Sequence, residues 1–296
     1  KISFNRFYKL FNYLSLFLII ASLCLLLFKG LNYGIDFKGG TLIELRSNNS
    51  ELNITKLRKS LTNMNLGDVN VKKFGTKTDY LIKFEKRNTN NPNLISDIKK
   101  NLVNEIGSDF DFRRVENVGP KVSQELLNSG MIAIGLSLAA MLFYIWIRFE
   151  WQFSLGAIVA IFHDVVITLG IFSLFNLEIN LSIVAAVLTI VGYSMNDTVV
   201  IFDRVRENLK KFSDIKIFEL TNISINETLS RTIITSITTL LALFSIYFFG
   251  GEILKGFSFA MILGVIFGTY SSIYIANPIL VFLKVSQRTI MKEDSD

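Results

Sequence analysis

Blocks of apolar residues alternate with polar segments along this chain, and six of the blocks are long enough to cross a lipid bilayer. A membrane-spanning helix needs ~20 consecutive, mostly apolar residues. The predicted spans are Leu10–Phe28, Met131–Ile147, Phe153–Phe175, Leu181–Phe202, Ile233–Phe249 and Phe257–Phe282. A hydrophobic content of 50% and a mean hydropathy of +0.43 support this interpretation. The pattern therefore predicts an α-helical membrane protein with six transmembrane helices.

One long polar segment, residues 29–130, separates the first two spans. Its periodicity predicts a strand, a helix, two strands, a second helix and a last strand. These elements are Thr41–Arg46, Ile54–Asn63, Val69–Phe74, Tyr80–Phe84, Leu94–Ile106 and Phe110–Val118. The β-α-β-β-α-β order is the ferredoxin-like arrangement, which serves many functions. The chain is thus predicted to have three parts, namely a tail with the first span over 1–28, an external α+β domain over 29–130, and a five-span bundle over 131–296.

Short polar motifs connect these elements. Asn53 is a helix cap by type and position, and Gly75–Asp79 and Arg87–Asn93 are predicted loops within the domain. Gly119 and Pro120 close the domain, because proline suits the first position of a new helix. The six spans contain no internal repeat, whereas many transporters consist of two related halves. The chain is therefore expected to be one half of a larger unit.

Basic residues gather beside the spans and predict how the chain is oriented. They are Lys1, Arg6 and Lys9 before the first span, Arg204, Arg206, Lys210, Lys211, Lys216 and Arg231 in a predicted loop over about 204–231, and Lys284, Arg288 and Lys292 after the sixth span. The positive-inside rule then places both termini and that loop in the cytoplasm, and residues 29–130 in the periplasm. Because orientation accounts for the net charge of +6, no nucleic-acid partner is predicted.

The N-terminal span and the single cysteine add little. The basic residues before the first span resemble those of a signal peptide, but no small-residue cleavage site follows, so a retained helix is predicted. The chain does not begin with Met, and a short preceding piece is expected. Cys24 is the only cysteine, so no intrachain disulfide is possible.

Ionisable residues inside the predicted spans are the most informative feature. Such a residue costs about 2.5–3.5 kcal/mol on insertion scales and commonly serves transport of charge. Asp197, next to Asn196, lies in the fourth span, and His163 and Asp164 lie near the middle of the third. Arg231 opens the fifth helix, whose polar face continues through Thr235 and its neighbours. We therefore expect six residues to form a proton pathway. They are Asp197, Arg231, Asn196, Asp164, His163 and Thr235.

The physical basis of this expectation is electrostatic. A low-dielectric surrounding favours the protonated form of a carboxyl group, whereas a nearby guanidinium favours the charged form. A rearrangement that changes the distance between Asp197 and Arg231 would thus couple proton movement to protein shape. The alternative is a static salt bridge or hydrogen bond that holds helices together. Asp203, at the end of the fourth span, is expected to pair with Arg206.

The sequence does not predict an enzyme. It has no nucleophile-elbow pattern, no phosphate loop and no Cys/His set for a metal, so no cofactor is expected apart from the proton as coupling ion. Asp164 and Asp197 could formally be the pair of an intramembrane aspartyl protease. The residues around Asp197 lack the Gly-x-Gly-Asp pattern of that class, which ranks this alternative low.

Several separated motifs resemble those of the SecD/SecF family of bacterial protein-export membrane subunits, in the resistance-nodulation-division (RND) superfamily. They are Gly34–Gly40, Val118–Val122, Phe149–Trp151, Phe162–Asp164, Tyr193–Thr198, Phe202–Asn208, Glu227–Thr232, Thr235–Ser236 and Gly268–Ser272. The resemblance covers nearly the whole chain. Ser123 departs from the family, which often has Gly there.

The resemblance implies an RND-type fold in which SecD supplies a related six-span half. It implies a role in late secretion at the bacterial inner membrane, where external domains engage a preprotein from the SecYEG channel and proton flow drives them. Asp197 and Arg231 match the family's proton-handling positions, with the other four pathway residues as neighbours. Gly39 and Gly40 are expected to shape the junction of the external domain, together with Gly119 and Pro120, because glycine permits unusual backbone conformations.

Two further hypotheses use the same residues. Half of an RND-type efflux transporter for small molecules or lipids would need the same spans and carboxylates, although the small external domain favours the export subunit. A scaffold that transports nothing would make Asp197 dispensable.

Overall fold

A computed structural model describes residues 2–48, 52–73, 77–85, 93–107, 110–212 and 215–291. The chain forms two compact units, a membrane unit of Lys1–Asn32 with Ile132–Asp296 and an external unit of Tyr33–Met131. The predicted loop Gly75–Asp79 lies partly, and the loop Arg87–Asn93 almost wholly, outside the described residues. Each unit is described by itself below.

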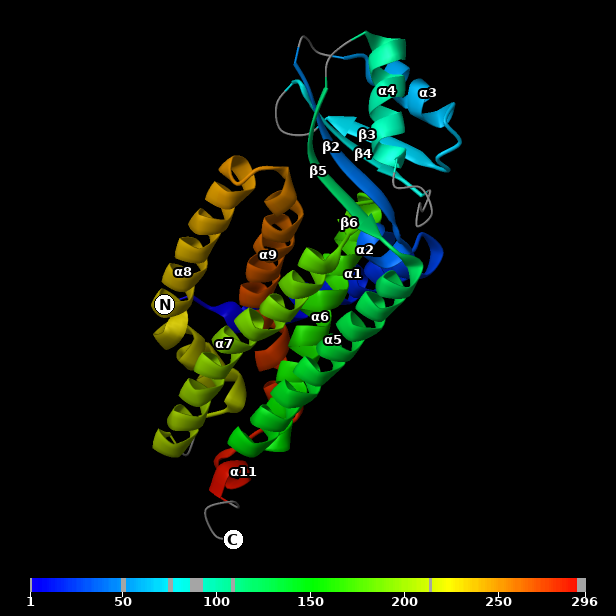
Figure 1. Ribbon diagram of the computed structural model, residues 1–296. Helices are drawn as coiled ribbons and strands as arrows, with labels where there is room; N and C mark the ends of the chain where they lie inside the picture. Colours follow the sequence, from blue (N-terminus) through cyan, green and yellow to red (C-terminus); the bar gives the residue numbers. More distant parts are fainter. Residues whose placement is uncertain are drawn as a thin grey trace. The chain divides into compact units, whose positions relative to one another are not determined.

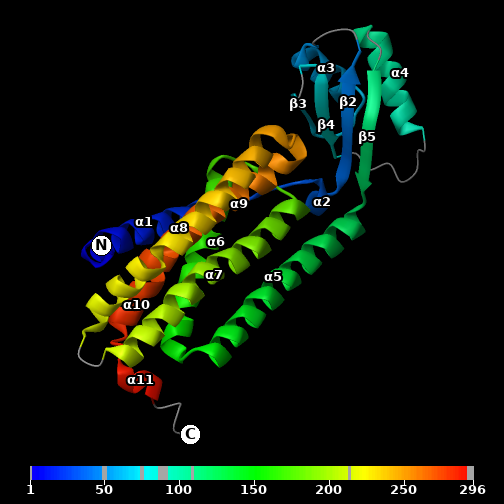
Figure 2. The ribbon, with the colours of Figure 1, turned by 90° about the vertical axis from the view of Figure 1, so that its left-hand side faces the viewer.

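Six helical segments of the described chain are long and apolar enough to cross a membrane, which confirms the predicted fold class. The elements of the membrane unit are η1 (Phe4–Phe7), α1 (Tyr8–Phe28), β1 (Asn32–Tyr33, at the boundary), α5 (Pro120–Arg148, which starts in the external unit), α6 (Trp151–Leu174), β6 (Glu178–Ile179), α7 (Leu181–Lys211), α8 (Ile217–Phe249), α9 (Glu252–Ser271), η2 (Ser272–Ala276), α10 (Asn277–Phe282) and α11 (Gln287–Met291). Figures 1 and 2 show α7, α8 and α9 side by side. These three helices form the surroundings of the candidate site.

The predicted cytoplasmic loop over about 204–231 is wrong in its extent. Helix α7 continues to Lys211 and α8 begins at Ile217, so the break between them is short. Asn208 explains the continuation, because its Nδ2 donates to Ser224 Oγ at 2.9 Å and to Glu227 Oε2 at 2.7 Å, joining the two helices. The polar residues that predicted a loop therefore belong to two helices and bind each other between them.

The sixth span is interrupted by a π-helical turn, η2, directly before Pro278. Proline has no backbone N–H to continue the helical hydrogen bonds. At the end of the turn, the side chain of Asn277 donates from its Nδ2 to Ser272 O at 2.7 Å. Such π-helical turns are frequent at functional sites.

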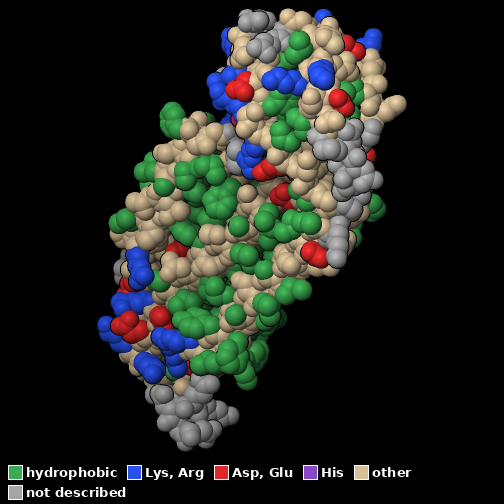
Figure 3. All heavy atoms as spheres, viewed as in Figure 1, with side chains coloured by type: hydrophobic (Ala, Val, Ile, Leu, Met, Phe, Trp, Pro, Cys, Tyr) green, Lys and Arg blue, Asp and Glu red, His purple; other side chains and the backbone are tan. Residues whose placement is uncertain are grey.

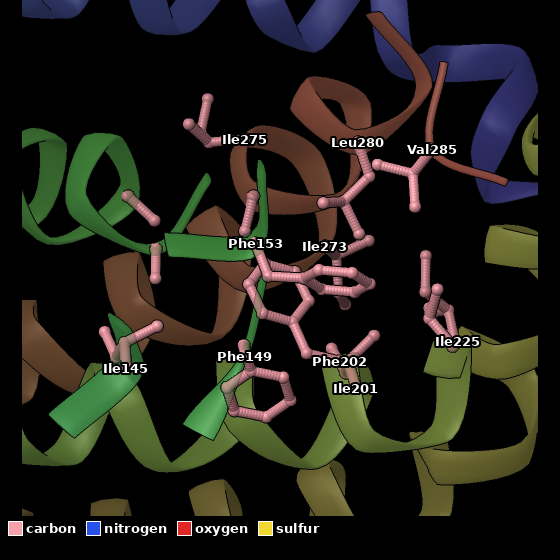
Figure 4. Packing of buried hydrophobic residues seen from close by; sticks show 14 of the residues in the cluster. Ile145, Phe149, Phe153, Ile201, Phe202, Ile225, Ile273, Ile275, Leu280 and Val285 are labelled. Carbon is pink, nitrogen blue, oxygen red and sulfur yellow. The ribbon is translucent and has the colours of Figure 1, made fainter. Parts of the chain in front are cut away.

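The core of the membrane unit includes a cluster of three aromatic rings (Figure 4). Phe153 and Phe202 meet edge to face with centroids 5.2 Å apart, and Phe149 stacks on Phe153 at 5.8 Å. Gly156 provides the space, because a Cβ there would lie 3.3 Å from the Phe202 ring and 2.9 Å from Ala276 O. The cluster therefore joins α6, α7 and η2.

Figure 3 shows hydrophobic side chains over the middle of the membrane unit. On the same face, Lys, Arg, Asp and Glu side chains gather where α7 ends and α8 begins. Such a division between an apolar band and a charged end is expected of helices that span a bilayer.

The external unit has the predicted β-α-β-β-α-β order. Its elements are α2 (Ile35–Lys38), β2 (Gly40–Ser47), α3 (Ile54–Thr62), β3 (Val69–Lys73), β4 (Asp79–Phe84), α4 (Leu94–Ile106) and β5 (Phe110–Val118). The antiparallel sheet has the order β3-β4-β2-β5, and Ile43 and Ile82 pair across its centre. Asn53 caps α3 as predicted, with its Oδ1 accepting from Thr55 N at 2.9 Å.

The apolar core of the external unit involves residues of the sheet and of both longer helices, including Leu57 and Ile98, which are fully buried. At the edge of this core, Arg46 on β2 makes two bonds to Asp79 on β4, at 2.5 and 2.6 Å. The Asp79 carboxylate raises the pKa of the Arg46 guanidinium. This ion pair joins two residues that lie directly opposite each other on the two central strands.

The four predicted junction residues lie together at one end of this sheet. Gly39 ends α2 with a φ of 76°, and Gly40 begins β2 with a φ of 134°. Gly40 pairs with Val118, directly before Gly119 and the start of α5 at Pro120. A Cβ on Gly40 would lie 2.8 Å from Phe84 O, so only glycine fits between the strands here.

Candidate functional site

Asp164 on α6 is a fully buried carboxyl group with every oxygen occupied. Its Oδ1 lies 2.8 Å from His163 Nδ1. Its Oδ2 accepts hydrogen bonds from Ser194 Oγ on α7 at 2.6 Å and from Ser271 Oγ on α9 at 2.7 Å. The side chain thus connects three helices through short hydrogen bonds.

His163 is equally buried and packs against aromatic rings of α9. Its imidazole stacks on Tyr270 with centroids 5.7 Å apart and meets the edge of Phe267 at 6.3 Å. Tyr270 Oη donates to Phe11 O on α1 at 2.9 Å. Among the described residues, His163 Nε2 has no hydrogen-bond partner, so the ring is held by Asp164 and by stacking.

Asp197 on α7 is buried to a similar degree, with 2% of its surface exposed, but it is held much more loosely. Among the described residues it accepts one hydrogen bond, from Thr269 Oγ1 on α9, at 3.4 Å. Thr269 Oγ1 in turn lies 2.7 Å from Ser236 Oγ on α8. A chain of two hydroxyl groups therefore links Asp197 to the fifth span.

Arg231 on α8 is exposed in this chain and forms no ion pair within the part of the chain that the structure describes. It lies on α8 five residues before Ser236, the residue whose hydroxyl links this helix to Asp197 through Thr269. Asn196 is exposed on α7, and Thr235 is half-buried with its hydroxyl donating to Arg231 O and Thr232 O, both at 3.0 Å. The predicted pathway residues thus divide into a buried set and an exposed set.

Charged residues at the end of α7 form a separate network, and the expected pair of Asp203 with Arg206 is wrong. Asp203 binds Arg148 at 2.8 Å, and Arg206 lies 3.2 Å from Glu150, because both partners lie at the turn between α5 and α6. The Glu150 oxygens are buried, and the contact with Arg206 does not meet hydrogen-bond geometry. Three helices therefore meet here through ion pairs that sequence spacing along one helix cannot show.

Sequence reasoning missed the serine and threonine residues that hold the two carboxyl groups. Ser194, Ser271 and Thr269 lie in otherwise apolar helices, and each was part of a motif without a stated role. A small hydroxyl residue in a span is a weak signal, because its hydroxyl commonly bonds to its own helix. Within the described residues no group of three His, Cys, Asp or Glu side chains suits a metal ion.

The comparison with known proteins agrees with this architecture. The family description "Protein export membrane protein SecD/SecF, C-terminal" matches residues 98–286, and "SecD/SecF GG Motif" matches residues 25–51, which include Gly39 and Gly40. The structure is similar to the crystal structure of SecDF, a translocon-associated membrane protein from Thermus thermophilus, with a TM-score of 0.86 and 34% identity over 96% of this chain. A second structure, SecDF in its super-membrane-facing form, matches all of this chain with a TM-score of 0.72. The chain therefore belongs to the SecD/SecF family of protein export membrane proteins.

Within that family, the chain is similar to individual proteins named as SecF subunits. Protein translocase subunit SecF of Rickettsia bellii is 46% identical over 268 residues, which are 89% of this chain and 88% of that protein. SecF of Cereibacter sphaeroides is 43% identical over 282 residues, 92% of this chain and 86% of that protein. These relatives are named as translocase subunits, which agrees with the prediction of a transport component rather than an enzyme. The chain spans 39% of the length of the SecDF chain it matches.

Proposed function

We propose that this multi-pass membrane protein is a subunit of a protein-export complex driven by the proton-motive force. It acts with SecD to promote late translocation of preproteins through SecYEG, with the proton as its coupling ion. The complex lies in the bacterial inner membrane. Both termini of this chain are in the cytoplasm, and its residues 29–130 are in the periplasm. The observation that carries the proposal is Asp197, a buried carboxyl group that, among the described residues, is held by one long hydrogen bond and lies near the guanidinium of Arg231, which makes no ion pair there.

The mechanism follows from the two states of Asp197. A low-dielectric site favours a neutral carboxyl group, and an approaching guanidinium favours a carboxylate. Arg231 forms no ion pair among the described residues, so movement of α8 toward or away from α7 would change the proton occupancy of Asp197. One elementary charge that crosses 100 mV supplies about 2.3 kcal/mol, enough to shift a conformational equilibrium substantially.

The exposed members of the pathway support the partnership with SecD. Arg231 and Asn196 lie at the surface of this chain. Exposed polar and charged groups within spans are costly in lipid, so they are expected to face protein or a water-filled path. Since the matched SecDF chain is more than twice as long, a second half is available to cover this surface. In this proposal, SecD completes the proton path beside Asp197.

The decisive experiment replaces Asp197 by Asn in cells that depend on this chain for export. Asp203→Asn is the matched control, because Asp203 lies on the same helix but its ion pair with Arg148 is exposed. Export is measured by pulse-labelling a secreted protein, and chain levels in the membrane are measured in parallel. Asp197→Asn should slow the export that depends on this chain at least about tenfold, which corresponds to ~1.4 kcal/mol of activation free energy. Asp203→Asn should export at nearly the rate of the unsubstituted chain.

Two outcomes would contradict the proposal. Unchanged export with Asp197→Asn would show that this carboxyl group carries no protons for export and would favour a scaffold. Lost drug resistance together with normal export would favour an efflux transporter.

A further inference from the structure

We propose that Asp164 is a positioning residue that fastens α7 to α9 and thereby holds Thr269 against Asp197. This inference rests on the proposed function of Asp197 and gives its buried neighbour a different role. It assigns Asp164 to holding the site, rather than to carrying the proton.

The first observation is a repeated contact between α7 and the sixth span, here called the α7–α9 seam. Residues four apart on one helix meet residues four apart on the other, as expected when helix ridges pack into grooves. The seam pairs are Ile190 with Gly264, Ser194 with Gly268, and Thr198 with Ser272. A Cβ on Gly264 would overlap the Ile190 side chain, and one on Gly268 would lie 3.1 Å from Ser194 Cα. The backbones therefore approach as closely as glycine allows.

The second observation is where Asp164 enters the seam. Its Oδ2 accepts one hydrogen bond from each side, from Ser194 on α7 and from Ser271 on α9. One step further, Thr198 Oγ1 lies 2.8 Å from Ser272 Oγ, at the start of the π-helical turn. Asp164 thus clamps the two helices directly beside the place where the sixth span changes its helical type.

The third observation connects this clamp to Asp197. Ser194 precedes Asp197 by three residues on α7, about one helical turn. Ser271 follows Thr269 by two residues on α9. The hydrogen bond from Thr269 to Asp197 is already long at 3.4 Å, so a small slide of α9 along α7 would break it. Asp164 is therefore placed to fix the contact on which Asp197 depends.

The occupancy of Asp164 supports a fastening role. Both of its oxygens accept bonds of 2.8 Å or less, and no part of the residue is exposed. Both oxygens are thus engaged by side chains on α6, α7 and α9. Breaking these hydrogen bonds would leave buried polar groups unsatisfied, which is costly. The arrangement is suited to staying intact while Asp197 changes its proton occupancy.

This geometry makes two substitutions at position 164 distinguishable. In Asp164→Asn, the amide oxygen can accept from both serine hydroxyls, and the amide nitrogen can donate to His163 Nδ1. The ring then carries its proton on Nε2, which loses no existing bond because Nε2 has no partner among the described residues. Asp164→Asn thus keeps all three contacts but cannot titrate, whereas Asp164→Ala removes all three.

The test measures export in cells with either variant beside the unsubstituted chain. We expect Asp164→Asn to keep at least about half of the export rate and Asp164→Ala to lose at least about tenfold, a difference of more than ~1 kcal/mol. The double variant Ser194→Ala with Ser271→Ala should resemble Asp164→Ala. Equal loss with Asn and Ala, at normal chain levels, would assign proton carriage to Asp164 and overturn the proposal. Full activity with Asp164→Ala would overturn it as well.

A second measurement reports the seam itself and does not depend on export. Cys24, the only cysteine, is replaced by Ser, and Thr198→Cys and Ser272→Cys are introduced, since their hydroxyl oxygens lie 2.8 Å apart. A disulfide needs two closely spaced cysteines. Because these two positions lie close together, oxidation in membranes should form the disulfide readily. Asp164→Asn should leave the extent of crosslinking unchanged, and Asp164→Ala should lower it severalfold. Unchanged crosslinking with Asp164→Ala would show that Asp164 does not position the seam, whatever Asp197→Asn does to export.

Discussion

Asp164 and Asp197 are the same kind of residue in the same bundle, yet their surroundings differ in one decisive respect. Asp164 has partners at 2.6, 2.7 and 2.8 Å from three helices. Asp197 has one partner within the described part of the chain, at 3.4 Å. Both are nearly inaccessible, so burial does not separate them. In the roles proposed above, hydrogen-bond occupancy distinguishes the carboxyl group that fastens helices from the one that exchanges a proton.

The helices around the two groups explain why they differ. Asp164 faces the α7–α9 seam, where Gly264 and Gly268 let backbones approach closely and short serine side chains reach it. Asp197 faces α8 as well, and Arg231 there is exposed in the single chain. Close helix packing supplies many donors at fixed positions, whereas a site beside an open face retains room for movement. Four substitutions outside the carboxyl groups test this comparison.

The largest effect is expected when the α7–α9 seam is forced apart. Gly268→Leu would insert a side chain where even a Cβ lies 3.1 Å from Ser194 Cα. Overpacking of this kind costs about 1–3 kcal/mol or more. We expect a lower melting temperature of the purified protein and loss of export. Gly135→Leu on α5 is the control, because a Cβ there meets nothing within 4 Å, and equal damage by both would contradict the role of the seam.

A change in the external unit should be nearly as damaging while it leaves both carboxyl groups untouched. Gly40→Ala places a Cβ 2.8 Å from Phe84 O and also forces alanine to a φ of 134°. Gly107→Ala shares the positive φ, at 73°, but its Cβ would meet nothing within 4 Å. The left-handed conformation alone costs alanine about 1–2 kcal/mol. Limited proteolysis of residues 33–131 should therefore be faster for Gly40→Ala than for Gly107→Ala.

Equal proteolysis rates for these two variants would show that the contact with Phe84 is unimportant. The same pair also sharpens the comparison of the carboxyl groups. Crosslinking of the α7–α9 seam through Thr198→Cys and Ser272→Cys should be unaffected by Gly40→Ala, since Gly40 belongs to the other compact unit.

A moderate effect is expected at Asp197 when Thr269, the donor that the structure shows for it, is changed. Thr269→Val keeps the shape of the side chain but deletes the hydrogen bond to Asp197 and the contact with Ser236. One hydrogen bond contributes about 0.5–1.5 kcal/mol, so export should fall by between about twofold and tenfold. Thr238→Val is the control, because its hydroxyl bonds to its own helix at Ile234 O. A loss as severe as that of Asp197→Asn would mean that Thr269 itself takes part in proton transfer.

The smallest effect is expected at Thr232, a buried neighbour on α8. Its Oγ1 has no hydrogen-bond partner among the described residues. Replacing an unsatisfied hydroxyl by a methyl group of similar shape is nearly neutral or stabilising. Thr232→Val should thus keep the melting temperature and the export rate within error. A marked loss would place Thr232 in the proton path beside Asp197.

Features that depend on local pattern were predictable from the sequence. The six spans follow from apolar blocks, and Phe110–Val118 matches its predicted strand at both ends. Asn53 caps its helix because a side-chain oxygen needs only the next few residues to do so. Asp197 was identified as a candidate because a carboxyl group in an apolar block is conspicuous whichever way the helix is turned. These predictions required no knowledge of which helices are neighbours.

Local pattern was misleading where residues of one segment bind another segment. The polar stretch over 204–231 resembled a loop, but Asn208 and Glu227 bind each other between two helices. Asp203 seemed to suit Arg206 on its own helix, but it binds Arg148 at the turn before α6. In both cases the true partner belongs to another helix, and local sequence pattern does not show which helices are neighbours.

The sequence by itself thus determined the membrane helices, the order of the external elements and the presence of Asp164 and Asp197 in the membrane. Only the tertiary structure decided that Asp164 is fully occupied by His163, Ser194 and Ser271, whereas Asp197 has one long hydrogen bond among the residues that the structure describes. The physical reason is that apolar length and periodicity are properties of one segment. The state of a buried carboxyl group is set by donors that helix packing brings from other segments.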